Sequence, residues 1–168
     1  MRRVSLAFVG LAAILSTSQP QAASHCQVGE TDYFSCQIHG TQKTLSICGS
    51  SDATEPSSGD AWLQYRFGRL NHVELAYPQD KLQSLLLFQA TNLTPIDDEG
   101  IRRDIYNLYF DLGAVNYNVE VRDARQPFFG VVVTVANKSV EYQCAGSFKN
   151  WQRLQGALFG ALVLSLAR

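Results

Sequence analysis

Apolar and polar residues alternate with a period of two along much of the chain, and this pattern predicts antiparallel β-hairpins. The clearest case is Ala61 to Pro78, AWLQYRFGRLNHVELAYP. With a turn centred on Leu70, the apolar residues of one face meet apolar residues across the strand. The predicted pairs are Leu63 with Tyr77, Tyr65 with Leu75, and Phe67 with Val73.

The other face of this hairpin is predicted to be solvated. The same register sets Arg66 opposite Glu74 as a surface ion pair, with Trp62 on the same face. Tyr109 points outward from a later predicted strand. Because aromatic and arginine side chains are enriched in binding hot spots, Trp62, Arg66 and Tyr109 are the candidate binding residues. A purely structural surface pair is the simpler interpretation of Arg66 and Glu74.

Three more hairpins follow the same rule. A turn at Gly40 and Thr41 sets Phe34 opposite Ile47 and Cys36 opposite Leu45. The two later hairpins span Asp104 to Arg122 and Val131 to Cys144. Their predicted pairs are Tyr106 with Val119, Asn107 with Asn118, Leu108 with Tyr117, Phe110 with Val115, Val131 with Cys144, Val133 with Tyr142, and Val135 with Val140.

Two segments between the hairpins are less regular. The crowded apolar cluster from Leu82 to Phe88 fits a helical turn or a strand covered on both faces, and a strand around Leu85 to Ala90 is favoured. Asp97 to Glu99 form an acidic run without the spaced oxygen ligands of a calcium loop, so we expect a solvated turn there.

The predicted fold class is therefore all-β, a mainly antiparallel meander of hairpins in a sandwich or barrel, with a short C-terminal helix. Residues 24–148 form a single β domain. Residues 149–168 change to helical periodicity and are predicted to form an apolar helix. The apolar run from Gly156 is too short to span a bilayer, so a helix closing one end of the sheet is favoured. Docking to a partner or peripheral contact with a membrane is the alternative.

Residues 1–23 have the features of a cleaved signal peptide. Arg2 and Arg3 precede the apolar run Val4 to Leu15, and small residues at Ala22 and Ala23 offer a cleavage site. The mature chain is expected to begin near Ser24, in the periplasm, without a transmembrane span.

The four cysteines, Cys26, Cys36, Cys48 and Cys144, all follow the predicted signal peptide. An even number in an oxidising compartment favours two disulfides over a zinc site, and the spacings contain no Cys-x-x-Cys motif. Cys48 has the opposite strand parity to Leu45, which faces Cys36, so a local bridge between Cys36 and Cys48 is disfavoured. The favoured pairing joins Cys36 to Cys144 and Cys26 to Cys48.

Charge and motifs argue against several function classes. Without Arg2 and Arg3, 12 basic residues stand against 15 acidic ones, so nucleic-acid binding is disfavoured. No nucleophile-elbow or zinc-protease motif is present, and we expect no enzyme activity, metal or cofactor. The three histidines, His25, His39 and His72, lie at a terminus or in predicted turns and are expected to be solvated.

In several of these residues the chain resembles a group of small exported proteins of Gram-negative bacteria. The likeness covers about Cys26 to Gly146, and it is most specific in Leu63 to Gly68 (LQYRFG), followed by Glu74-Leu75 and Tyr77-Pro78. It implies a periplasmic β-rich domain and no particular chemistry. The acidic run at Asp97 replaces a glycine-rich stretch of that group. Periplasmic lysozyme inhibitors are similar in size, compartment and disulfide content.

We therefore expect a non-enzymatic periplasmic binding protein whose partner is another protein. An inhibitor or immunity-type partner of a cell-wall enzyme is one specific form. The alternatives are an envelope structural or assembly protein that docks through its apolar C-terminal helix, and an unrecognised enzyme.

Overall fold

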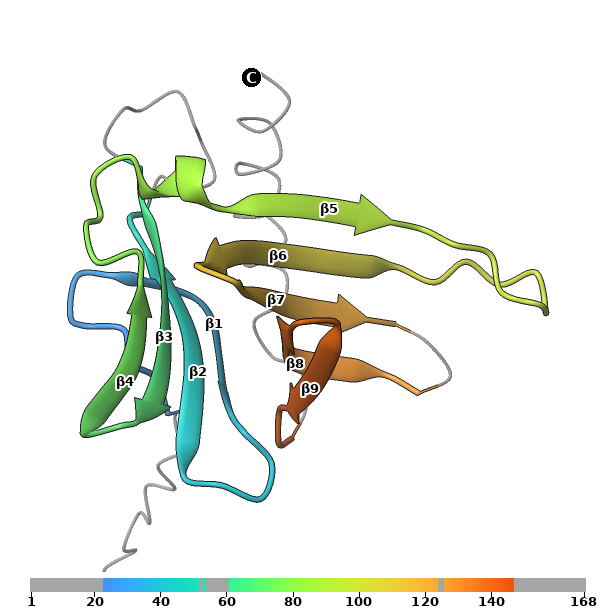
Figure 1. Ribbon diagram of the computed structural model, residues 1–168, viewed down its shortest axis with the longest axis horizontal. Coiled ribbons are helices and arrows are strands. Elements are labelled where there is room, and N and C mark those ends of the chain that lie inside the picture. The colour runs from blue at the N-terminus through green and yellow to red at the C-terminus, as the bar shows by residue number, and fades with distance from the viewer. Residues whose placement is uncertain (1–22, 52, 54–60, 124–125, 147–168) are drawn as a thin grey trace, which may run out of the picture.

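The computed structural model describes residues 23–51, 53, 61–123 and 126–146. These residues form two antiparallel sheets, one of four strands in the order β1-β2-β3-β4 and one of five in the order β5-β6-β7-β8-β9 (Figure 1). The predicted all-β class and hairpin meander are confirmed. The predicted signal peptide and C-terminal helix lie outside the described residues.

The elements are β1 (Thr31–Gln37), β2 (Lys43–Gly49), β3 (Leu63–Arg69), β4 (His72–Tyr77), the short 3₁₀ helix η1 (Ser84–Leu87), β5 (Gln89–Leu93), β6 (Ile105–Leu112), β7 (Val115–Arg122), β8 (Phe128–Val135) and β9 (Lys138–Gln143). In Figure 1 the strands of the first sheet run across those of the second, as in a sandwich with crossed layers.

The two sheets are joined where β1 meets β9. Ile38 and Cys144 form an antiparallel bridge, and the His39 amide donates to the Gln143 carbonyl at 2.8 Å. A disulfide links Cys36 to Cys144, with 5.6 Å between their Cα atoms. The first and last strands are thereby fastened at one corner of the molecule.

Both disulfides have the predicted pairing, since the second one joins Cys26 to Cys48. Two such bonds suggest an oxidising environment such as the periplasm or the extracellular space. Among the described residues, no helix has the length and apolar character needed to cross a bilayer.

An aromatic cluster holds the sheets together. The Tyr77 ring stacks on Phe110 of the second sheet at 4.2 Å between centroids, and Tyr65 lies 5.2 Å from the same ring. Phe88, just before β5, contacts both Tyr77 and Phe110 edge-on. Buried aliphatic side chains surround the cluster, among them Leu45, Ile47, Leu63, Leu108, Val119 and Val131.

The register of the first hairpin is as predicted, with Phe34 opposite Ile47 and Cys36 opposite Leu45. The other three predicted registers are wrong by two residues. The structure pairs Tyr65 with Tyr77, Phe67 with Leu75, Tyr106 with Val121, Leu108 with Val119, Phe110 with Tyr117, Val131 with Tyr142, and Val133 with Val140. A shift of two keeps side chains on their predicted faces, so the assignment of inward and outward residues survives. The exception is the start of β4, where the bulge sets Val73 opposite Gly68 and thus on the outer face.

Tight turns account for the shift. Only Gly113 and Ala114 separate β6 from β7, and only Ala136 and Asn137 separate β8 from β9. Ala136 and Asn137 both have positive φ, of 48° and 65°, which suits a two-residue hairpin turn. In the third case a bulge at Gly68 (φ 148°) resets the pairing of β3 with β4, and a Cβ there would collide with the His72 carbonyl.

The predicted strand over Leu85 to Ala90 is wrong in its first half. Ser84 to Leu87 form the 3₁₀ turn η1, and β5 begins only at Gln89. The Ser84 hydroxyl accepts a hydrogen bond from the Leu63 amide at 2.9 Å, which ties this segment to β3 of the first sheet. Only Leu85 of the three leucines is buried there, because a helical turn directs its side chains around the axis.

Candidate binding cleft

Arg66 is the candidate binding residue that the structure places differently from expectation. Its side chain is buried, with 6% of the residue exposed. Its guanidinium holds the Glu30 carboxylate through two hydrogen bonds, of 2.6 and 2.8 Å. The predicted surface pair of Arg66 with Glu74 is therefore wrong, and Glu74 bonds Lys43 instead at 2.6 Å.

Arg66 is buried because the N-terminal segment crosses the outer face of the first sheet. The Arg66 guanidinium also donates to the His25 carbonyl and to Gln64 Oε1, each at 2.8 Å. The disulfide from Cys26 to Cys48 pins the same segment to β2. The polar face of β3 is thus covered by polar partners instead of water.

Trp62 and Tyr109 lie on different sheets. Trp62 is partly buried just before β3, and the Lys81 ammonium lies 4.2 Å from its ring centroid. Lys81 also bonds Glu30 at 2.8 Å, so Trp62 belongs to the same network as Arg66. Tyr109 is partly buried on the second sheet, paired with Gln89 and Asn118. The three residues do not share one exposed patch, and their binding roles stay predictions.

Glu30 has a pKa lowered to about 2 from an ordinary 4.5. Burial by itself raises the pKa, but the hydrogen bonds from Arg66, Lys81 and the Gln27 amide together lower it further than burial raises it. The ionised carboxylate is therefore a structural part of the fold.

Acid is expected to weaken the fold through Glu30. Because the folded pKa lies below the unfolded one, this stabilisation is complete above 4.5 and is lost as pH falls toward about 2. The loss should reach about 3 kcal/mol, at ~1.4 kcal/mol per pKa unit. Urea unfolding across this range should show a steeper loss for the wild type than for Glu30→Gln. Parallel curves would contradict this role of Glu30.

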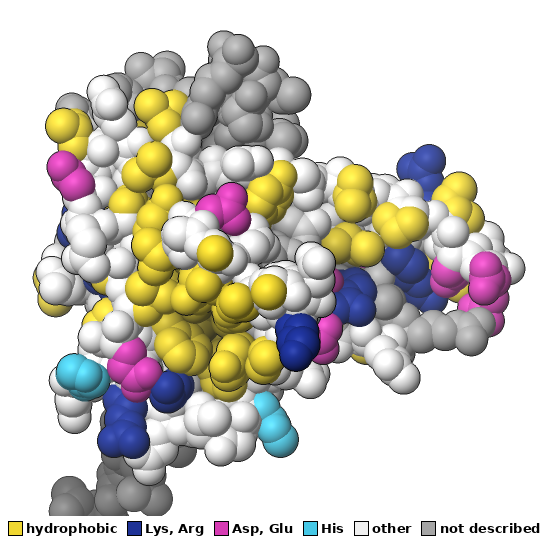
Figure 2. Space-filling model, viewed as in Figure 1, with side chains coloured by type: hydrophobic (Ala, Val, Ile, Leu, Met, Phe, Trp, Pro, Cys, Tyr) yellow, Lys and Arg dark blue, Asp and Glu magenta, His cyan; other side chains and the backbone are white. Residues whose placement is uncertain are grey.

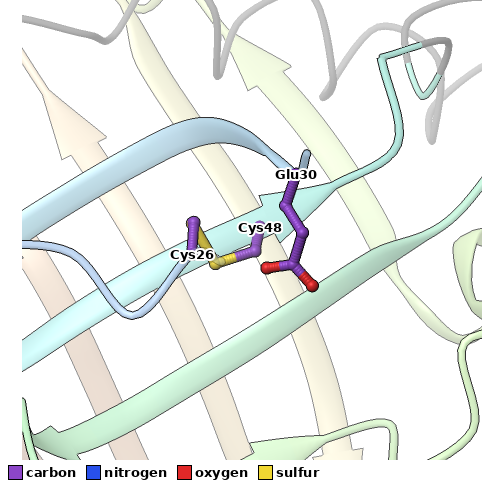
Figure 3. Close-up of side chains that lie close together, drawn as sticks. All are labelled: Cys26, Glu30 and Cys48. Carbon is purple, nitrogen blue, oxygen red and sulfur yellow. A yellow bond between two sulfur atoms is a disulfide. The ribbon is translucent and has the colours of Figure 1, made fainter. Parts of the chain in front are cut away.

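Figure 3 shows Glu30 beside Cys26 and Cys48, whose possible ligand atoms lie within 4.8 Å of one another. This trio does not suit a metal ion. Both sulfur atoms are joined in a disulfide and provide no thiolate, and the carboxylate already bonds Arg66 and Lys81. The three residues fasten the N-terminal segment to the sheet.

His25 is buried, which corrects the expectation of a solvated side chain. Its Nε2 lies 3.1 Å from both the Thr44 and the Gly68 carbonyl oxygens, and its amide donates to Ser46 Oγ. Because both carbonyls are acceptors, Nε2 carries the proton. His39 and His72 are exposed, as expected.

A feature not singled out from the sequence is an apolar cleft between the sheets. Figure 2 shows hydrophobic side chains gathered in a hollow there. By strand alternation the inner faces contribute apolar residues near the hairpin tips, several of them partly or largely exposed. We define the cleft by Phe67 and Leu75 of the first sheet and Tyr117, Val133, Val140 and Tyr142 of the second.

The cleft exists because the sheets touch over only part of their inner faces. The Tyr77–Phe110 stack closes one end, and a contact between the rings of Phe67 and Tyr142 at 5.9 Å marks its floor. Beyond these contacts Val140 is 54% and Tyr142 37% exposed. All six residues of β9 are exposed, although Phe67 contacts the Tyr142 ring.

Charged residues border the cleft. Lys43 and Arg69 are cross-strand neighbours on the face that carries Phe67, and the Lys43 ammonium lies 5.3 Å from the Phe67 ring centroid. Lys138 follows the same alternation as Val140 on β9. The hydrogen bond from Lys43 lowers the pKa of Glu74. A shallow cavity of about 570 Å³ opens beside Lys43 and Arg69.

One sequence signal points to the cleft. The alternation stays apolar up to the hairpin tips, through Val115, Val135 and Val140, where strands at a protein surface more often carry polar residues.

No family model, curated protein or solved structure matches this chain. The resemblance to small exported proteins of Gram-negative bacteria stays a prediction, and a function has to be inferred from the cleft itself.

Proposed function

We propose that the mature chain is a non-enzymatic, exported binding protein that recognises its partner through the apolar cleft. The observation that carries this proposal is the exposed apolar inner face at Val140 and Tyr142, next to Phe67 of the first sheet. Contiguous apolar surface of this kind marks binding sites on soluble proteins, because covering it with an apolar partner is favourable.

The scaffold around the cleft supports this proposal. The disulfide from Cys36 to Cys144 fixes the corner at which the sheets join, so the cleft is formed before a partner arrives. The buried ionisable residues Glu30, Arg66 and His25 hold the N-terminal segment through their hydrogen bonds. These contacts give each of them a structural role.

The neutral dye Nile red should bind the cleft and fluoresce. Val140→Asp should weaken the binding about tenfold or more, since a charge in place of a valine costs at least ~1.4 kcal/mol of binding free energy. The measurement is a fluorescence titration of the disulfide-bonded protein, with circular dichroism to verify folding.

Leu93→Asp is the matched control. Leu93 is also 54% exposed, but by alternation it lies on the opposite face of the second sheet from Ala90, which is buried in the core. Its replacement should leave the affinity for Nile red unchanged. Equal affinities of Val140→Asp and the wild type would contradict the proposal.

The narrower form of the proposal takes a cell-wall enzyme as the partner. In that case the wild-type protein should inhibit a lysozyme-type enzyme, Val140→Asp should lose the inhibition, and Leu93→Asp should keep it. Absence of inhibition at low salt would remove the narrower form and leave binding through the cleft standing.

A further inference from the structure

We propose that the ligand of the cleft is an anionic single-chain amphiphile, specifically a free long-chain carboxylate. Its hydrocarbon chain lies along the apolar cleft, and its carboxylate is held by Lys43 and Arg69. This inference rests on the general form of the proposed function, and it names a small molecule as the ligand in place of the cell-wall enzyme of the narrower form.

The backbone of the cleft floor favours a hydrocarbon over a peptide. Strands β3, β7 and β8 are each paired with a strand on both sides, so their amide and carbonyl groups are already hydrogen-bonded. The other two strands of the cleft, β4 and β9, are edge strands, and their free backbone groups lie in the plane of the sheet and not toward the cleft. A peptide in the cleft would bury polar backbone groups against side chains such as Phe67, Tyr117 and Val133, which offer them no matching array of partners. A hydrocarbon chain has no such requirement.

The charge at the border favours an anionic head group. Among the described residues, Lys43, Arg69 and Lys138 lie on the inner faces next to the cleft, and Glu74 is the carboxylate bonded there. Because Glu74 balances one of the three cations, a net positive charge remains. Asp111 has the opposite strand alternation and accepts a hydrogen bond from Asn116. Its charge still reaches Tyr77 at the closed end of the cleft, where burial and then Asp111 raise the pKa of the Tyr77 hydroxyl.

The cations lie at the edge of the apolar surface, where the head group of an amphiphile would lie if its chain filled the cleft. The Lys43 ammonium touches the edge of the apolar surface at Phe67, and Arg69 pairs with Lys43 directly across β2 and β3. The adjoining cavity of about 570 Å³ leaves room for a head group. A guanidinium presents paired N–H donors that fit the two oxygens of a carboxylate, which is why we choose this head group.

The test compares two amphiphiles that share a twelve-carbon chain, laurate and dodecyltrimethylammonium, as competitors of Nile red on the disulfide-bonded mature protein at low salt. Laurate should displace the dye roughly tenfold more effectively, because two surface cations each contribute a modest attraction. Raising the salt concentration should reduce this preference by screening.

The double variant K43Q/R69Q should lose the roughly tenfold preference for laurate over dodecyltrimethylammonium. Arg102→Gln is the control and should keep the preference. Arg102 is exposed and forms an isolated β-bridge with Ile96 in the segment between β5 and β6. If the double variant fails to fold, Lys138→Gln replaces it, with a smaller loss in the same direction.

The possible failures are distinguishable. Equal displacement by the two amphiphiles, or an unchanged preference in K43Q/R69Q, would overturn this inference. The proposed function would still stand if Val140→Asp weakened the binding of Nile red. If Val140→Asp left the affinity for Nile red unchanged, both the inference and the proposed function would be overturned. Binding to vesicles of anionic phospholipid without binding of free laurate would assign the cations to a membrane surface and also overturn the inference.

Discussion

Replacing Cys36 and Cys144 together by alanine is expected to lower the free energy of unfolding by about 4–5 kcal/mol, the largest loss we anticipate. The disulfide joins residues 108 apart in sequence, so its removal frees nearly the whole domain in the unfolded state. In the folded state it reinforces a corner at which Ile38 and Cys144 form a single bridge. Urea denaturation of the purified variant against the wild type measures the effect.

The second disulfide provides the control. Cys26 and Cys48 are 22 residues apart, so their joint replacement by alanine should cost about 1–1.5 kcal/mol less, given the logarithmic dependence on loop length. A larger loss for the Cys26 and Cys48 variant would mean that pinning the N-terminal segment matters more than closing the domain, and would contradict this ranking.

Arg66→Ala is expected to destabilise the protein by about 3–5 kcal/mol, as when one partner of a buried ion pair is removed. The substitution takes away both hydrogen bonds to Glu30 and leaves the His25 carbonyl and Gln64 Oε1 without their donor. Buried acceptors without donors are costly. Urea denaturation at neutral pH measures the loss.

Lys81→Ala tests whether burial is the cause. Lys81 bonds the same Glu30 carboxylate, but its side chain is 41% exposed, so its removal should cost about 1 kcal/mol or less. Similar losses in the free energy of unfolding for the Arg66 and Lys81 variants would contradict burial as the cause of the larger effect expected for Arg66.

The face of each strand could be predicted from the sequence except at the start of β4, where the bulge turns Val73 to the other face. The register of three hairpins could not be predicted. Tyr65, Phe67 and Leu75 all point inward as expected, because alternation depends only on parity. A shift of two residues exchanges one apolar pair for another, so matching apolar residues cannot distinguish Tyr77 from Leu75 as the partner of Tyr65. The turns decide the register, through Gly68 and through the positive φ of Asn137.

The disulfide pairing was predictable because it also depends on parity. Cys48 points away from the face that holds Cys36, and Cys36 meets Cys144 instead. The surroundings of Arg66 could not be predicted in this way. A polar strand face looks the same in sequence whether water or a polar segment covers it, and Glu30 lies far from Arg66 along the chain without a periodic pattern of its own.

The position of the cleft on β8 separates two kinds of selective constraint along one strand. Val131 is completely buried in the core, while Val135, four residues on, is 45% exposed near the hairpin tip. Substitutions at the buried end act on folding, whereas under the proposed function those toward the tip would act on recognition with little cost in stability. Under that proposal, partner preference would diverge between descendants of this protein while the nine described strands persist.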